Sequence, residues 1–166
     1  HPDPDELGRV FSPRLAIAAE PAPFLEALGH VSARAEWGAW YDDARAGYEA
    51  WSATPGLLDD IVRGLRDLLP DDAIVTNGAG NYATWAHRYF RFKTFRTQLA
   101  PTSGSMGYGL PAAVAAKITA PERQVVCFAG DGCLMMTVQE LATAAQFGAP
   151  IVVVVFNNGI YGTIRM

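Results

Sequence analysis

The sequence predicts an α/β protein whose mostly parallel sheet is covered by helices on both faces. Three observations support this prediction. Residues 124–129 and 151–156 are short apolar segments, and apolar residues recur at helical spacing in the sequence between them. Each of the two segments ends in a turn rich in glycine or asparagine. Short apolar segments between turns are typical of buried strands, and strands that alternate with helices are typical of parallel sheets. We therefore expect a three-layer αβα architecture, which these residues complete only in part.

Changes in composition divide the chain into three predicted segments. Residues 1–29 hold a short apolar segment and a helix candidate over 21–28, and look like the tail of a preceding domain. Residues 30–54 are rich in tryptophan, tyrosine, alanine and acids, which favours a helical linker. The aromatic residues of this linker suit two alternatives: a contact with another subunit or domain, or packing on the same chain. Residues 55–166 carry the alternating strand and helix patterns of the α/β domain.

Proline, glycine and helical spacing mark the elements of this third segment. Apolar residues at helical spacing predict an amphipathic helix over 57–69 with a proline at its start. A strand over 73–76 and a helix over 106–118 are expected next. Between the two apolar strands one helix is predicted, because apolar residues recur there at helical spacing: Leu134, Val138, Leu141, Ala142 and Ala145.

The strongest functional signal lies where the two apolar strands end. Gly130-Asp131-Gly132 follows the first strand, and Asn157-Asn158 follows the second. A right-handed crossover brings Asp131 and Asn158 to the carboxyl edge of one sheet, where open α/β sheets bind ligands. Carboxylate and amide oxygens suit Mg²⁺ or Ca²⁺ rather than zinc, and Mg²⁺ usually adds waters and phosphates. Gly132 permits close backbone approach and helix-start N–H groups favour an anion, so we expect a magnesium-bridged diphosphate.

These motifs resemble the thiamine diphosphate (ThDP) enzymes of the acetolactate synthase and benzoylformate decarboxylase type. Their signature is Gly-Asp-Gly, a spacer of this length and Asn-Asn, which reads GDGCLMMTVQELATAAQFGAPIVVVVFNN here. Residues 103–113 resemble the family's Gly-x-Met-Gly-x-Gly-Leu-Pro-Ala-Ala segment, and residues 157–165 also fit. The opening residues 1–9 resemble the close of the family's middle domain. The resemblance implies the ThDP-binding fold, with residues 55–166 as a truncated C-terminal ThDP/Mg-binding domain.

The resemblance also implies metal ligands and cofactor contacts. Mg²⁺ would bind the Asp131 carboxylate, the Asn158 side chain and the backbone carbonyl of Ile160. Met106 would hold the cofactor in a bent shape from below the thiazolium ring, and Cys133, which stands where serine is common, would contact the diphosphate through its backbone. The implied cofactor-binding residues are Asn81, Tyr82, Gly104, Met106, Gly130, Gly132, Cys133 and Tyr161.

The implied function is that of a fragment of a ThDP- and Mg²⁺-dependent, acetolactate-synthase-like enzyme. Such an enzyme decarboxylates a 2-oxo acid and transfers the resulting carbanion or enamine to a carbonyl acceptor. A 2-oxo acid decarboxylase of the benzoylformate decarboxylase type and a non-catalytic module of the same fold are alternatives. The family's activating glutamate lies in a separate N-terminal domain, so the fragment alone is expected to be inactive. The resemblance implies a homodimer or homotetramer and leaves FAD binding open.

Composition argues against several other classes of protein. Half of the residues are apolar, which disfavours disorder, and the formal net charge is −4. No apolar segment is long enough to cross a bilayer and no leader opens the sequence, so a cytoplasmic location without membrane contact is expected. Cys127 and Cys133 fit reduced thiols better than a disulfide or a zinc site.

Two further motifs carry weaker functional hypotheses. Residues 87–96 interleave basic and aromatic side chains, as single-stranded nucleic-acid sites do. In an acidic chain without a nucleic-acid motif, they favour an ordinary loop or short strand, and we expect no nucleic-acid partner. Gly107-x-Gly109-x-x-Ala112 superficially fits the dinucleotide-binding glycine pattern. That pattern requires a strand directly before it and an acid about twenty residues after it, and neither is well met here.

Overall fold

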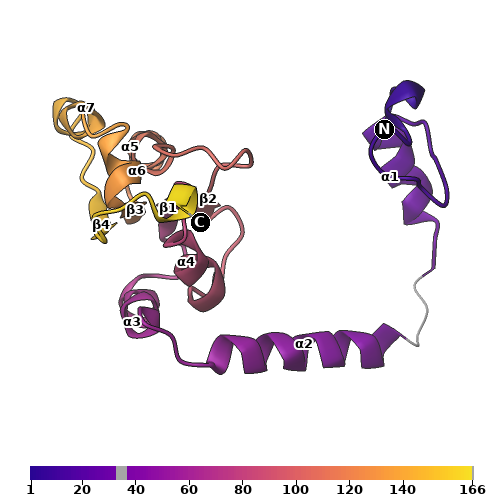
Figure 1. Cartoon of the computed structure of the whole chain (residues 1–166), viewed down its shortest axis with the longest axis horizontal. Helices are drawn as coiled ribbons and strands as arrows, with labels where there is room; N and C mark the ends of the chain where they lie inside the picture. Colours follow the sequence, from indigo (N-terminus) through magenta and orange to yellow (C-terminus); the bar gives the residue numbers. More distant parts are fainter. Residues whose placement is uncertain (33–36, 166) are drawn as a thin grey trace. The chain divides into compact units, whose positions relative to one another are not determined.

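The computed structural model describes residues 1–32 and 37–165, which belong to two units, His1–Trp51 and Ser52–Met166 (Figure 1). None of the described residues of the first unit is buried. The predicted helix over 21–28 is present, and part of the predicted linker, residues 33–36, lies outside the described residues. The elements that begin in this unit are η1 (Pro4–Glu6), α1 (Pro21–Gly29) and α2 (Trp37–Ala53).

The described part of the second unit is built on a four-stranded parallel sheet with the order β2-β1-β3-β4. Its strands are β1 (Ile74–Asn77), β2 (Gln98–Leu99), β3 (Val125–Gly130) and β4 (Val152–Phe156). The predicted parallel α/β architecture is confirmed, and β1, β3 and β4 begin one residue later than expected. Strand β2 was not predicted, because two exposed residues are too few to show a periodic pattern.

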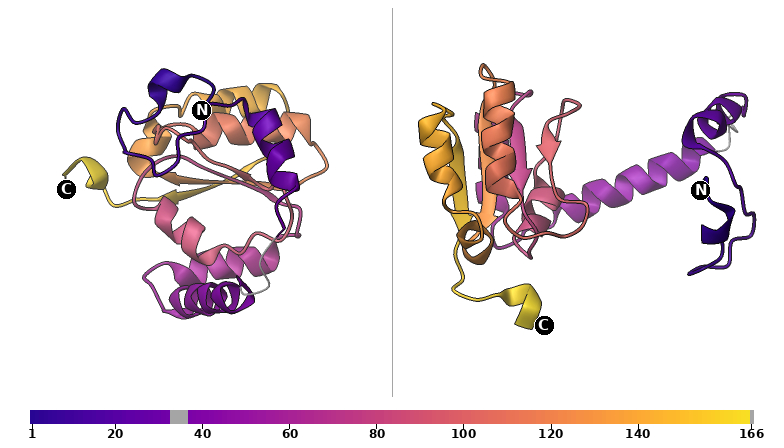
Figure 2. Two further views of the ribbon diagram at one scale, coloured as in Figure 1. Left: turned by 90° about the vertical axis from the view of Figure 1, so that its right-hand side faces the viewer. Right: turned by 90° about the horizontal axis from the view of Figure 1, so that it is seen from above.

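Helices cover both faces of this sheet, as predicted (Figure 2). Successive residues of β3 point to opposite faces, as the geometry of a strand requires, so Cys127 packs in one core and Phe128 in the other. The first core contains α5 (Gly109–Thr119) and α7 (Glu140–Gln146); the second contains α3 (Asp59–Leu68) and α4 (Ala83–Tyr89). Burial on both faces explains why β3 reads as an unbroken apolar segment. No helix among the described residues has both the length and the apolarity needed to cross a bilayer.

The single helix predicted after the acidic turn is wrong. The chain forms a short helix, α6 (Asp131–Met135), and then α7. Thr137 lies between them and its Oγ1 donates a hydrogen bond to the Gly107 carbonyl oxygen at 2.9 Å. This break shifts the helical phase, so Val138 and Leu141 are exposed, while Ala144 is the buried residue of α7. Helical spacing counted across a break therefore did not identify one buried face.

Two other helices begin later than predicted. Helix α3 begins at Asp59 rather than at a proline, and Asp59 and Asp60 occupy its first turn, where acidic side chains interact favourably with the helix dipole. Helix α5 begins at Gly109 rather than at Met106. Gly107 has a φ of +78°, which lies outside the right-handed helical region and prevents an earlier start.

Gly109 allows α5 to begin directly against the end of β1. A Cβ at this position would lie 2.9 Å from the backbone nitrogen of Gly78 and 3.0 Å from the carbonyl carbon of Asn77. Because these atoms belong to backbone that has little room to shift, we expect Gly109→Ala to lower the free energy of unfolding by about 1–3 kcal/mol. Urea denaturation followed by circular dichroism would measure the change.

Gly64→Ala is the matched control for this substitution. Gly64 lies inside α3, and a Cβ there would meet nothing within 4 Å. Alanine should therefore raise the free energy of unfolding by about 0.5–1 kcal/mol, because it forms helix more readily than glycine. Equal effects at the two positions would contradict the close contact between α5 and β1.

Candidate functional site

A cavity of about 610 Å³ lies at the carboxyl edge of the sheet. The segments that follow β1, β3 and β4 contribute to its lining. The chain places β2 on one side of β1 and β3 on the other, so the direction of winding reverses between β1 and β3. Open α/β sheets bind their ligands at such reversal points. Every residue assigned above to the metal or the cofactor lines this cavity: Asn81, Tyr82, Gly104, Met106, Gly130, Asp131, Gly132, Cys133, Asn158, Ile160 and Tyr161.

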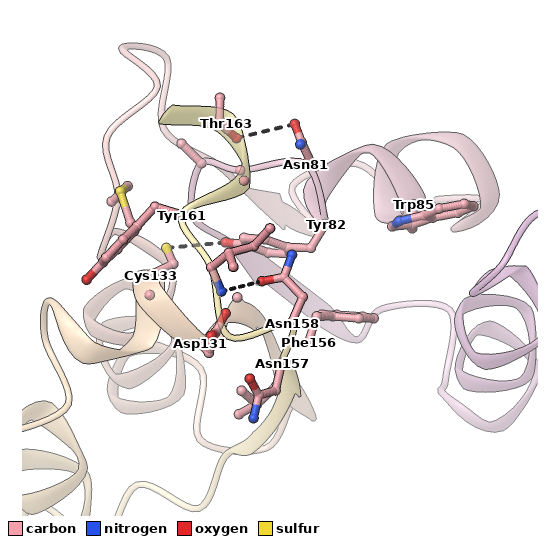
Figure 3. A pocket seen from close by; sticks show the side chains of 18 of the residues that line it. Asn81, Tyr82, Trp85, Asp131, Cys133, Phe156, Asn157, Asn158, Tyr161 and Thr163 are labelled. Atoms are coloured by element: carbon pink, nitrogen blue, oxygen red, sulfur yellow. Dashed lines mark hydrogen bonds between the residues drawn. The ribbon is translucent and has the colours of Figure 1, made fainter. Parts of the chain in front are cut away.

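Asp131 and Asn158 come together because their strands end side by side. Gly130 of β3 pairs with Phe156 of β4 in parallel register. The Gly159 backbone N–H then donates to Asp131 Oδ2 at 3.0 Å, so the two turns are directly connected. The Ile160 N–H donates to Asn158 Oδ1 at 3.2 Å within the second turn (Figure 3). The expected approach of these two turns at one edge of the sheet is thus observed.

The oxygen ligands at this edge suit a hard cation that is also bound by ligands from outside the protein. Among residues 1–32 and 37–165, no three His, Cys, Asp or Glu side chains gather into a metal site. Asp131 supplies a carboxylate, Asn158 an amide oxygen and Ile160 a carbonyl, which are donors that Mg²⁺ accepts. A carboxylate has about four lone-pair positions, so the bond from Gly159 leaves Asp131 with acceptor capacity. This donor set suits a magnesium ion that is also bound by phosphate oxygens.

The absence of a side chain at Gly132 lets the ring of Tyr161 pack directly against the backbone of the acidic turn. A Cβ at this position would lie 2.6 Å from the ring of Tyr161. Helix α6 is only five residues long, so any anion here would be bound by individual N–H groups such as those of Gly132 and Cys133, and hardly by a helix dipole. Backbone N–H groups of this kind suit a diphosphate, which accepts hydrogen bonds from them.

The loop after β1 forms another wall of the cavity. Asn81 Oδ1 accepts a hydrogen bond from Thr163 Oγ1 at 3.3 Å. The Tyr82 ring stacks on Phe156 with 5.8 Å between ring centroids, and its hydroxyl donates to Cys133 Sγ at 3.3 Å. Burial, together with the contact to Cys133, raises the pKa of Tyr82, so the phenol is neutral at physiological pH. The Tyr82 hydroxyl is therefore engaged within the protein.

The loop before α5 brings Gly104 and Met106 to the cavity.

Both cysteines are buried free thiols, as predicted. Burial raises the pKa of Cys127 to about 11, which keeps this core thiol protonated. The Cys133 sulfur accepts a hydrogen bond from the Gly107 N–H at 3.1 Å, on the protein side of the acidic turn. This placement leaves the backbone of Cys133, and not its thiol, for a contact with a bound anion.

The apolar part of the cavity was missed from sequence. It is lined by the side chains of Leu57, Leu58, Ile61, Trp85 and Phe156. The first three belong to the apolar residues that predict the amphipathic helix over 57–69, but it is Val62 that is fully buried there. Helical spacing gives the apolar side of a helix, and only the tertiary structure shows which residues extend beyond the core toward a cavity.

Comparison with known proteins agrees with this geometry. The family described as "Thiamine pyrophosphate enzyme, C-terminal TPP binding domain" matches residues 78–166. The chain is 32% identical to the acetolactate synthase large subunit of Parasynechococcus marenigrum (strain WH8102), over 98% of this chain and 28% of that protein. It is 31% identical to the acetolactate synthase isozyme 1 large subunit of Escherichia coli (strain K12), over 98% of this chain and 30% of that protein.

A relative with a different name is similar to the same extent. The chain is 33% identical to the pyruvate oxidase of Lactiplantibacillus plantarum (strain ATCC BAA-793 / NCIMB 8826 / WCFS1), over 98% of this chain and 29% of that protein. The chain thus spans less than a third of the length of these relatives. The family match includes the loop after β1, the acidic turn and the Asn157-Asn158 turn. The chain therefore belongs to the thiamine pyrophosphate enzymes, and residues 78–166 correspond to their C-terminal TPP-binding domain.

Proposed function

We propose that the cavity binds ThDP together with Mg²⁺, and that the protein uses them to decarboxylate a 2-oxo acid and to join the remaining unit to a carbonyl acceptor. One observation carries this proposal: Asp131, Asn158 and Ile160, whose oxygens suit Mg²⁺, line one cavity together with Gly132, and the Gly159 N–H joins the two turns. Membership of the thiamine pyrophosphate family supplies the identity of the ligand.

The residues of this chain would bind and orient the cofactor. Asp131, Asn158 and the Ile160 carbonyl would hold Mg²⁺, and the N–H groups of Gly132 and Cys133 would bind phosphate oxygens. When bound, ThDP would supply the electron sink for the charge that loss of carbon dioxide leaves on the substrate. The apolar wall that includes Trp85 would exclude water from the rings of the cofactor.

The roles of the remaining cavity residues follow from their positions. Met106 would support the ring system, and the Gly104 carbonyl would accept a hydrogen bond from the cofactor's amino group. Asn81 would contact the diphosphate from the opposite wall, exchanging its bond with Thr163 for one to the cofactor. The Tyr82 hydroxyl is bonded to Cys133, so Tyr82 would contribute its backbone and ring edge.

Joining of two carbonyl compounds is the reaction that the relatives favour. Two of the relatives described above are named acetolactate synthase, which supports a carboligase. The pyruvate oxidase relative supports oxidation of a 2-oxo acid as a second candidate, for which FAD could be needed. A homodimer or homotetramer and a cytoplasmic location complete the proposal.

An assay of the full-length protein with pyruvate, ThDP, Mg²⁺ and FAD tests the proposed function and separates these candidates. Carboligation predicts carbon dioxide and acetolactate, formed from two pyruvate molecules, in equal amounts. Simple decarboxylation predicts acetaldehyde, and oxidation predicts oxygen uptake. The full-length protein is used because the family's activating glutamate is expected in a different domain. No carbon dioxide from pyruvate or from larger 2-oxo acids would overturn the proposal and favour a non-catalytic module.

A further inference from the structure

We propose that Cys133 is a positioning residue whose thiol sulfur fixes the turn carrying Met106 and the side chain of Tyr82 against the acidic turn. It would act through these neighbours and not by contact with a ligand. The proposal deepens the proposed function and rests on it, because the geometry that it fixes is that of the cofactor cavity.

The first observation is that the sulfur is the meeting point of two donors. Cys133 lies in the short helix α6 and is only 4% exposed. Its Sγ accepts one hydrogen bond from the Gly107 backbone N–H at 3.1 Å and another from the Tyr82 hydroxyl at 3.3 Å. Figure 3 shows the Tyr82 hydroxyl pointing at this sulfur. The sulfur therefore connects the loop after β1, the turn after β3 and the turn before α5.

The second observation is that Gly107 is held on both sides by the same region of the chain. Its N–H bonds to Cys133, and its carbonyl accepts a hydrogen bond from Thr137 Oγ1 at 2.9 Å. A Cβ at Gly107 would lie 2.9 Å from the Cβ of Met136, so the turn packs directly against the residue that follows α6. Met106 immediately precedes Gly107 and lines the cavity, so a shift of Gly107 would displace Met106.

The third observation is that neighbouring residues leave space for the sulfur. A Cβ at Gly78 would lie 2.2 Å from Cys133 Sγ and 2.9 Å from the Tyr82 hydroxyl oxygen. The Tyr82 ring is also fixed by Phe156, on which it stacks, and by Gly130, where a Cβ would lie 2.9 Å from the ring. The thiol thus fills a space that these residues leave, where its sulfur accepts hydrogen bonds from the Gly107 N–H and the Tyr82 hydroxyl. Removing the sulfur would leave the buried Gly107 N–H without this partner.

The test compares Cys133→Ala with Cys133→Ser, using two ligands. The affinity for ThDP depends on the whole cavity, whereas the affinity for inorganic pyrophosphate with Mg²⁺ depends only on the part of the cavity near Asp131. We expect Cys133→Ala to weaken ThDP binding about tenfold, the effect of losing one buried hydrogen bond. Pyrophosphate binding should change less than about twofold, since its expected contacts are backbone groups and the metal. Cys133→Ser restores an acceptor and should recover most of the loss. Calorimetric titration of the full-length protein, unaltered and in both variants, measures all six affinities.

Amide hydrogen exchange at Gly107, measured without any ligand, provides the second readout. We expect exchange of this N–H to be about tenfold faster in Cys133→Ala and near its original rate in Cys133→Ser. Unchanged exchange at Gly107 would overturn the positioning role, as would equal losses for ThDP and pyrophosphate or a serine variant that behaves like alanine. If Cys133→Ala does not fold, Tyr82→Phe tests the same link, because it removes one donor and keeps the ring. It should weaken ThDP binding but not pyrophosphate binding, and equal losses would again overturn the role.

The two readouts separate this proposal from the proposed function. If the unaltered protein binds neither ThDP nor pyrophosphate, the proposed function fails. The exchange measurement then decides the structural link alone: faster exchange in alanine with recovery in serine supports it, and unchanged exchange overturns it.

Discussion

Asp131→Asn is expected to abolish magnesium-dependent binding of ThDP. Asp131 is the only charged group among the three proposed metal ligands, and its replacement by a neutral amide removes that charge while keeping the shape of the side chain. Substitution of residues that merely support a metal ligand costs about 10–100-fold in affinity, so loss of the ligand itself should cost at least about 100-fold. Calorimetric titration of ThDP in the presence of Mg²⁺ measures this loss.

Asp67→Asn is the matched control, since Asp67 is an exposed acid of α3 and does not line the cavity. It should leave the affinity for ThDP unchanged. The asparagine at position 131 still offers an oxygen to the Gly159 N–H, so the thermal stability of the ligand-free protein should also stay close to that of the unaltered protein. Unchanged ThDP affinity in Asp131→Asn would show that Asp131 is not a ligand of the metal.

Phe128→Ala is expected to have the largest effect on stability. Phe128 is fully buried in β3, and its ring meets those of Phe90 and Phe156 edge-on, at centroid distances of 6.4 and 5.7 Å. Truncation of a buried phenylalanine costs about 3–5 kcal/mol, because the transfer free energy is lost and a cavity remains. Typical domains are stable by about 5–15 kcal/mol, so this loss is a large share of the total. Urea denaturation measures the change in unfolding free energy.

The matched control for this core substitution is Phe147→Ala. Phe147 follows α7 and is 63% exposed, so its removal should change the free energy of unfolding by less than about 0.5 kcal/mol. Phe128→Ala should also weaken ThDP binding, because Phe156 supports the ring of Tyr82 at the cavity wall. Equal stability losses for the two alanine variants would contradict the placement of Phe128 in the core between β3 and α4.

The parts of the fold that were predicted from sequence are those that local patterns and connection rules determine. Strand β3 is buried on both faces, so its residues form an unbroken apolar segment that is visible without a structure. The approach of Asp131 to the Asn157-Asn158 turn follows from parallel pairing of β3 and β4 and from the hand of the crossover. Neither inference requires knowledge of a particular side-chain contact.

The parts that were missed depend on contacts between residues far apart in sequence. The break between α6 and α7 accompanies the bond from Thr137 to Gly107, thirty residues earlier in the chain. The inward position of the Cys133 thiol depends on the space left by Gly78 and on donors from two other loops. Strand β2 exists because Gln98 and Leu99 pair with β1, and their own sequence carries no strand pattern. Periodicity cannot report such tertiary effects.

The most direct test of the central claim is calorimetric titration of ThDP into the full-length protein, first with Mg²⁺ and then with EDTA. The proposed site predicts saturable binding with Mg²⁺ that is lost when EDTA removes the metal, because Asp131 and Asn158 would hold the diphosphate through the ion. Absence of binding in both conditions, or equal binding in both, would contradict the assignment of these residues to a magnesium-bridged cofactor site.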